Sequence, residues 1–140
     1  MSNSTDPISV LVAEDDPDDR VLADEILQQI NFVDDVRFVA DGQELLDYLR
    51  RDGRYHGAAD WRRPNLVLLD LYMPQMDGLE ALEEMQRDPD LASIPVVVLT
   101  GSESGSDIDQ AHALGARGYM VKPLTFQRVV VTLESQQHEE

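Results

Sequence analysis

The side chains best suited to chemistry in this sequence are acids that follow apolar runs. Asp70 ends the run Leu66–Leu69, and Pro74 and the pair Asp77-Gly78 then force the chain to turn. An apolar run without alternation is typical of a strand that is buried on both faces of a parallel sheet. A carboxylate at the carboxyl end of such a strand lies where open α/β sheets bind ligands. We therefore predict that Asp70 is a nucleophile that accepts a phosphoryl group.

A second group of acids follows another apolar run, at residues 8–13. Helix-start preferences explain residues 16–19, which offer an N-cap aspartate, a proline for the first helical position and two acids for the positive end of the helix dipole. Glu14 and Asp15 have no such structural explanation. They would lie at the end of the first strand, just before the helix begins.

The elements that must position these acids alternate regularly along the chain. Apolar runs and periodic patterns predict strands at 8–13, 36–39, 66–70, 94–99 and 118–121, separated by helices that run to about Ile30, carry Leu45–Leu49, span 78–87, end at Gly115 and span 125–137. Such alternation predicts right-handed βαβ crossovers and a doubly wound, flavodoxin-like α/β fold with parallel strand order 2-1-3-4-5. We expect one domain over residues 8–137, with flexible tails at 1–7 and 138–140.

This topology brings Glu14, Asp15 and Asp70 to one edge of the sheet. Two carboxylates at ~4 Å repel each other by up to about 4 kcal/mol at an effective dielectric constant near 20, so a cation should offset them. An all-oxygen ligand set favours a hard, octahedral ion. The sequence therefore predicts a Mg²⁺ site.

The same edge receives Thr100 and Lys122 from the last two strands. A hydroxyl, an ammonium and Mg²⁺ together could hold the three equatorial oxygens of a phosphoryl group while Asp70 attacks in line. Lys122 is the one lysine beside ten arginines, which suggests that a compact point charge is required there. The Lys122-Pro123 bond could be cis.

The composition of the chain excludes or disfavours several classes of function. The chain has 140 residues, no cysteine and a net charge of −17, which excludes thiol chemistry and argues against direct nucleic-acid binding. No signal-peptide pattern or apolar run of membrane-spanning length is present, so we expect a soluble, cytoplasmic protein without membrane contact.

Three details concern packing. The connection Arg50–Pro64 is long, and we expect its aromatic residues, Trp61 included, to fold onto the body of the domain. The first helix should present an apolar stripe that includes Val21. Val131 lies off the apolar face of the last helix and hints at a self-contact.

These motifs resemble a known family, the receiver domains of two-component response regulators, over residues 8–135. The resemblance rests on the pair Glu14-Asp15, on Asp70 with Met-Pro-x-x-Asp-Gly after it, on Thr100-Gly101 and on Gly-Tyr-Met-Val-Lys-Pro at 118–123. The long Trp-containing connection, the lead into the fourth strand and the absence of an output domain look like the single-domain regulators associated with phytochrome-type photosensor kinases.

The resemblance implies that a partner sensor histidine kinase phosphorylates Asp70. It implies that Asp15 and Asp70 ligate Mg²⁺ directly, that Tyr72 contributes its backbone carbonyl and that Glu14 acts mainly through water. Tyr72 is bulkier than the residue often found at its position, and we predict that it shields the acyl phosphate from hydrolysis.

The phosphoryl group would be bound by Lys122, Thr100 and Gly101, with Pro123 forming the turn beside it. Thr100 and Tyr119 would form the switch, the hydroxyl moving toward the phosphate and the ring turning inward behind it. The signal would leave through the face made by the last two helices and the strand between them. Its recipient would be a downstream protein, a histidine phosphotransfer protein or a second copy in a homodimer.

Two other functions remain open at this point. The protein could be a Mg²⁺-dependent phosphohydrolase with an aspartate nucleophile, although such an enzyme would use an acid where this chain has Tyr72. It could also be a degenerate receiver that serves only as a docking scaffold. The favoured interpretation is a switch rather than an enzyme, with only self-catalysed phosphotransfer and autodephosphorylation.

Overall fold

A five-stranded parallel sheet forms the centre of the computed structural model, which describes residues 6–101 and 105–137. The strand order is β2-β1-β3-β4-β5, as the sequence predicts. The strands are β1 (Ile8–Ala13), β2 (Val33–Val39), β3 (Leu66–Asp70), β4 (Val96–Thr100) and β5 (Gly118–Val121). This is the doubly wound, flavodoxin-like arrangement.

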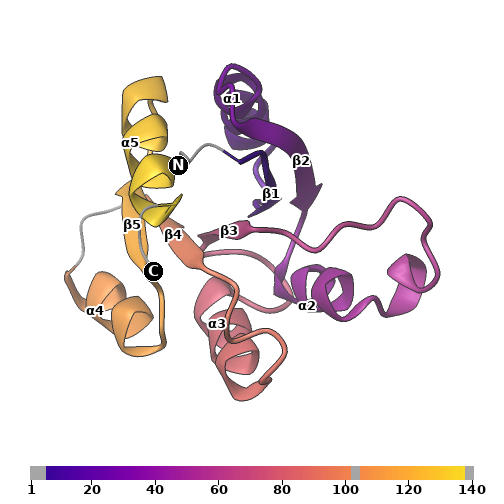
Figure 1. Ribbon diagram of the computed structural model, residues 1–140. Coiled ribbons are helices and arrows are strands. Elements are labelled where there is room, and N and C mark those ends of the chain that lie inside the picture. Colours follow the sequence, from indigo (N-terminus) through magenta and orange to yellow (C-terminus); the bar gives the residue numbers. More distant parts are fainter. Residues whose placement is uncertain (1–5, 102–104, 138–140) are drawn as a thin grey trace.

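Helices cover both faces of the sheet (Figure 1). They are α1 (Pro17–Gln28), α2 (Gly42–Arg50), α3 (Gly78–Arg87), α4 (Gly105–Ala113) and α5 (Phe126–Gln137), with a 3₁₀ turn η1 (Gly53–Tyr55) after α2. The helices α1 and α5 pack on one face, and α2, α3 and α4 pack on the other. The three central strands are therefore buried on both sides, which explains why their sequences are apolar at nearly every position.

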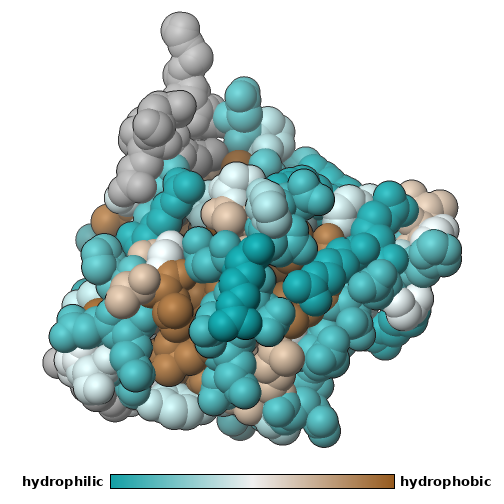
Figure 2. All heavy atoms as spheres, turned by 90° about the horizontal axis from the view of Figure 1, so that it is seen from below, coloured by the Kyte–Doolittle hydropathy of each residue, from teal (hydrophilic) through white to brown (hydrophobic). Residues whose placement is uncertain are grey.

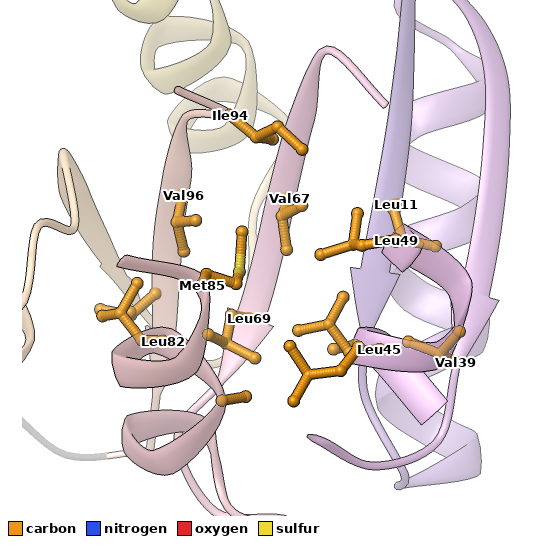
Figure 3. Close-up of a cluster of buried hydrophobic side chains, with 14 of the residues drawn as sticks. Leu11, Val39, Leu45, Leu49, Val67, Leu69, Leu82, Met85, Ile94 and Val96 are labelled. Atoms are coloured by element: carbon orange, nitrogen blue, oxygen red, sulfur yellow. The ribbon is translucent and has the colours of Figure 1, made fainter. Parts of the chain in front are cut away.

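Alternate residues of each central strand enter two separate cores. Leu11 and Val67 contribute to the core beneath α2 and α3, whereas Val10 and Leu68 contribute to the core beneath α1 and α5. Figure 3 shows the first of these cores, in which Leu45 and Leu49 of α2 and Leu82 and Met85 of α3 point toward the strands. The period-two geometry of the strands thus binds both helix layers to one sheet.

Aspartates start the helices that follow the first three strands. The carboxylate of Asp16 accepts hydrogen bonds from two backbone amides at the start of α1, and that of Asp41 accepts one, from the Glu44 amide, at the start of α2. Asp77 and Glu80 form a reciprocal capping box at α3. α1 and α3 consequently begin at defined residues close behind the ends of β1 and β3, which carry the acids of the candidate site.

The structure corrects three expectations. β2 begins at Val33 rather than at residue 36. β4 begins at Val96 rather than at Ile94, because Pro95 has no N–H to donate to the neighbouring strand; its carbonyl accepts a hydrogen bond from the Val67 amide. Val21 is 58% exposed instead of lying on the apolar stripe of α1. At 100° per residue Val21 lies far around the helix from the buried Ile26 and Leu27, so the expected stripe was too wide.

The connection from α2 to β3 folds onto the body of the domain, as predicted. The indole Nε1 of Trp61 donates to the carbonyl of Tyr48 at 2.8 Å, and the Tyr48 hydroxyl donates to the carbonyl of Arg62 at 2.8 Å. Tyr55 packs against the edge of the Tyr48 ring at a centroid distance of 4.9 Å. His56, in contrast, is exposed.

The face seen in Figure 2 is mainly hydrophilic, with a narrow hydrophobic strip. Among the helices that the structure describes, none has the length and apolar character required to cross a lipid bilayer. Val131 is 56% exposed, in agreement with its predicted position off the apolar face of α5. Its self-contact stays a prediction.

Candidate functional site

The ends of β1 and β3 bring the predicted acids together. These strands are neighbours in register, with Ala13 opposite Leu69, so the residues that follow them are adjacent. Glu14, Asp15 and Asp70 each place a carboxylate oxygen within 4.8 Å of the others. Glu14 and Asp70 are buried, whereas Asp15 is exposed.

Lys122 extends from the end of β5 into this cluster. Its Nζ lies 2.7 Å from Oε1 of Glu14 and 2.9 Å from Oδ2 of Asp70. A third carboxylate, that of Asp19 in the first turns of α1, accepts a hydrogen bond from the same ammonium at 2.9 Å. One cation therefore contacts three acids, and Asp15, which lies beside Glu14 and Asp70, brings the cluster to four acids.

The electrostatics of the cluster are unbalanced. Burial raises the pKa of the Glu14 carboxyl to about 7; the ion pair with Lys122 opposes this effect, and the nearby Asp70 carboxylate adds to it. Burial alone would lower the pKa of Lys122, but its contacts with Glu14, Asp19 and Asp70 outweigh burial and raise that pKa above its ordinary value. The lysine is thus held charged, while one of its acids is poised to take up a proton near neutral pH.

The backbone fixes the two buried acids. The amide of Asp16 donates to Oε2 of Glu14 at 3.2 Å, and the amide of Tyr72 donates to Oδ1 of Asp70 at 3.0 Å. Gly78 allows the start of α3 to approach the acceptor strand, because a Cβ there would lie 2.3 Å from the carbonyl oxygen of Asp70. The side chain of Asp70 is therefore oriented by the turn that follows it.

The other predicted site residues lie on the last two strands. Thr100 is fully buried at the end of β4, and its carbonyl accepts a hydrogen bond from the Lys122 amide at 2.8 Å. Gly101 follows it and is exposed, and Tyr119 of β5 is 46% exposed. The Lys122-Pro123 bond is cis, as the sequence suggested.

Asp19 is the residue that the sequence analysis missed. Its position in the first turn of a helix explained it fully as a dipole-stabilising acid. The available signal was its place in the first turn of a helix that begins at the carboxyl edge of the sheet. That signal did not identify its partner, because Lys122 is 103 residues away in sequence.

The cluster fits a divalent cation. Its donors are carboxylate oxygens from Glu14, Asp15 and Asp70, which suit a hard ion such as Mg²⁺ or Mn²⁺. Oε1 of Glu14 is buried and accepts no hydrogen bond, although it meets the ammonium as an ion pair. The exposed Asp15 leaves the cluster open to solvent on one side, where retained waters could complete an octahedral shell.

The fold and this constellation define the receiver class of signalling domains. The chain belongs to the response regulator receiver domain family, whose model matches residues 10–134. It is thus a receiver of two-component signalling.

Its relatives include a response regulator and a probable regulatory protein. It is 37% identical over 123 residues to the response regulator Rcp1 of Synechocystis sp., covering 87% of this chain and 82% of Rcp1. It is 36% identical over 129 residues to the probable methanogenesis regulatory protein FilR2 of Methanothrix harundinacea, covering 92% of this chain and 81% of that protein.

Two solved structures support the same assignment. The phosphorylated cyanobacterial phytochrome response regulator RcpA superposes with a TM-score of 0.79 at 35% identity, over 93% of this chain and 91% of RcpA. The Mn²⁺-bound form of Rcp1 superposes with a TM-score of 0.78 at 32% identity, over 92% of this chain and 91% of Rcp1.

Proposed function

We propose that this chain is a phosphorylation-operated switch that receives a phosphoryl group on Asp70 from a sensor histidine kinase. The P–N bond of the kinase phosphohistidine would break as a carboxylate oxygen of Asp70 forms the new P–O bond. Hydrolysis of the resulting acyl phosphate would restore the carboxylate and release inorganic phosphate. The observation that carries this proposal is the junction of Asp70, Glu14 and Asp15 with the partly buried ammonium of Lys122.

The residues around Asp70 would divide the work. Asp15, Asp70 and the backbone carbonyl of Tyr72 would hold Mg²⁺, with Glu14 contributing through water. Bound Mg²⁺ would supply the positive charge that offsets the carboxylates and the phosphoryl oxygens. Lys122 would exchange part of its contact with the acids for a contact with a phosphoryl oxygen.

The remaining site residues would bind and report the phosphoryl group. Thr100 and Gly101 would complete its oxygen contacts, and Pro123 would hold the turn that aims Lys122. Movement of the Thr100 hydroxyl toward the phosphate and of the Tyr119 ring inward would then shift an existing equilibrium of the α4-β5-α5 face. That face would bind a downstream protein, a histidine phosphotransfer protein or a second copy of the chain.

The description of RcpA suggests the source of the signal. RcpA is a phytochrome response regulator, and its likeness extends over nearly the whole of both chains. We therefore propose a phytochrome-type kinase as the partner. Rcp1 binds Mn²⁺ in its solved structure, which supports a divalent ion at the corresponding acids of this chain.

The test is phosphorylation by acetyl phosphate with Mg²⁺, followed by intact-protein mass spectrometry. Wild type should gain the mass of one phosphoryl group, and Asp70→Asn, which is nearly isosteric, should gain none. Equal labelling of both proteins would assign the acceptor elsewhere. No labelling of wild type would support a docking scaffold, and continued turnover of a phosphomonoester would support a phosphohydrolase.

A further inference from the structure

The connection between α2 and β3 concentrates positive charge in an acidic protein. Residues 50–63 hold five of the ten arginines and two aspartates, so this segment is net positive in a chain of net charge −17. The middle of the segment reaches back to the start of α2, where Arg54 pairs with Glu44. Arg51 at the end of α2 and residues 61–63 before β3 lie at the opposite edge, where the strands begin, and are therefore remote from the carboxylate cluster at the strand ends.

Three of these arginines are already neutralised by carboxylates. Arg50 lies 3.5 Å from Asp88 and 3.8 Å from Glu84 across the α2–α3 contact. In the same way Arg54 pairs with Glu44, and Arg62 lies 3.4 Å from Asp34. These three pairs attach the connection to α2, α3 and β2.

Arg51 and Arg63 are held differently. The Arg51 guanidinium lies over the Trp61 ring at 4.6 Å and donates to the carbonyl of Ala58 at 3.1 Å. Arg63 donates to the carbonyl of Asp90 at 2.8 Å. Within residues 6–101 and 105–137, neither of them forms an ion pair with a carboxylate, and both are exposed.

A hollow of about 530 Å³ lies between these two side chains. It is lined by Arg50, Arg51, Trp61 and Arg63 and by residues of the segment that leads into β4. That segment contributes two carboxylates, of Asp88, which is paired with Arg50, and of Asp90, so three guanidinium groups face two acids and the lining is net positive. A guanidinium has five N–H donors, and each of these arginines uses only one nitrogen on the protein. Their remaining donors are thus pre-positioned in a fork geometry that matches carboxylates.

We propose that this hollow, lined by Arg51, Trp61 and Arg63, binds an acidic segment of a partner protein through its carboxylates. At physiological ionic strength charges more than about 8 Å apart are largely screened, so the local arginines decide the contact rather than the overall charge. A nucleic acid would extend well beyond two arginines onto an acidic surface, which disfavours it. The surface lies apart from the acceptor aspartate, so the partner could remain bound while Asp70 is modified.

A second copy of this chain is a poorer occupant. A two-fold dimer through this surface would place the arginines of one copy against those of the other. A head-to-tail contact with an acidic patch of the next copy would continue into a ring or an open filament, so every copy would have to carry both surfaces in matching orientation. An acidic segment of a different protein meets neither difficulty.

The test uses a hexaglutamate peptide as the probe and hexaglutamine as its uncharged control. Trp61 is the one tryptophan of the chain and contacts Arg51, so its fluorescence reports occupancy directly. Wild type should bind hexaglutamate, with weaker binding at higher salt, and should ignore hexaglutamine. Arg51→Gln/Arg63→Gln should bind at least about tenfold more weakly, as expected for the loss of two charge-assisted contacts.

The matched control is Arg117→Gln/Arg128→Gln, which removes the same charge from exposed positions beside β5 and on α5. This variant should bind hexaglutamate like wild type, and circular dichroism should show that both variants are folded. Equal losses in the two variants would reduce the effect to overall charge and overturn the proposal. Absence of binding by wild type would do the same, and so would self-association, measured by sedimentation, that Arg51→Gln/Arg63→Gln abolishes.

Discussion

Glu14 is buried and Glu44 is largely buried, and their surroundings shift the pKa values of the two side chains in opposite directions. Glu14 shares one ammonium with Asp70 and Asp19, and burial raises its pKa to about 7. For Glu44 burial also opposes ionisation, but hydrogen bonds from Tyr55 and from the Ala40 amide, together with Arg54, outweigh it and lower the pKa. The same side chain is thus held ionised in one place and pushed toward its neutral form in the other.

This difference distinguishes a network that stabilises the fold, around Glu44, from a cluster that serves the function, around Glu14. The Glu44 network is complete: its charge is matched, and it ties α2 to the 3₁₀ turn of the connection. The cluster around Glu14 has more acids than cations and reaches balance only when a further positive charge arrives. An unbalanced buried cluster reduces stability, and such sites are typical of function.

Removing the central cation should have the largest effect. Lys122→Met would leave Glu14, Asp19 and Asp70 together without compensation, so we expect the free energy of unfolding at pH 8 to fall by about 3 kcal/mol. Added Mg²⁺ should recover part of this loss. Urea denaturation measures both quantities.

Arg54→Met is the matched change in the Glu44 network, and its cost should be clearly smaller because Arg54 is exposed. Mg²⁺ should not alter the stability change that it causes. Equal losses in the free energy of unfolding of Lys122→Met and Arg54→Met would contradict the proposed difference between the two networks.

The next effect is a pH dependence carried by Glu14. Its folded-state pKa lies above the ordinary value of 4.5, so the folded protein binds the extra proton. This contribution to stability is complete below pH 4.5 and is lost as the pH rises through about 7, by up to about 3 kcal/mol. Glu14→Gln should remove that decline in urea denaturation curves measured between these pH values.

Divalent ions should reverse the sign of this dependence in wild type. Ion binding requires the ionised carboxylates, so saturating Mg²⁺ should make the protein more stable at pH 8 than at pH 5. Glu14→Gln should also bind the ion more weakly. A wild-type stability that does not change with pH in the absence of Mg²⁺ would contradict the shifted pKa.

Glu44→Gln should act in the opposite direction and by less. The lowered pKa of Glu44 contributes stability above its unfolded-state pKa, and this is lost as the pH falls through the folded-state value. We expect the variant to be about 1 kcal/mol less stable than wild type at pH 7 and to converge with it in acid. Ion affinity, measured by calorimetry, should be unchanged; a weakened affinity would show that the two networks are coupled.

The fold and most of the cluster could be predicted because they depend on local patterns. Apolar runs identify buried strands, and parallel connectivity then decides which strand ends are adjacent, so Glu14, Asp15 and Asp70 could be placed together. Lys122 could be added because it follows the last strand. None of these steps requires knowledge of how side chains pack.

The failures depend on packing or on distant partners. Asp19 is already explained as an acid at the start of a helix, and no residue near it in sequence indicates that its carboxylate pairs with Lys122. The exposure of Val21 depends on the exact rotation of α1 against the sheet. The packing of Trp61 onto the domain could be predicted from its apolar ring. The group that accepts its hydrogen bond, the carbonyl of Tyr48, could not be predicted, because it depends on how the connection turns.

The smallest predicted effect concerns Tyr72, which links the acceptor loop to a different element. Its backbone amide holds Asp70, while its hydroxyl donates to Asp107 in the first turn of α4. The side chain is 61% exposed, so losing it should scarcely change stability. We expect Tyr72→Ala to lose the phosphoryl group several-fold faster than wild type, because water would reach the acyl phosphate more easily.

Tyr72→Phe separates the ring from the hydroxyl. If the bond to Asp107 keeps the ring near the acceptor, the phenylalanine variant should lose its phosphoryl group at a rate between those of wild type and Tyr72→Ala. Asp107→Asn, which keeps an acceptor oxygen, should behave like wild type. Decay of the phosphorylated mass after removal of acetyl phosphate measures all three variants, and an unchanged rate in Tyr72→Ala would refute the shielding. Because the bond ends on α4, a faster decay in Tyr72→Phe would also mean that the position of this helix controls how long Asp70 stays phosphorylated.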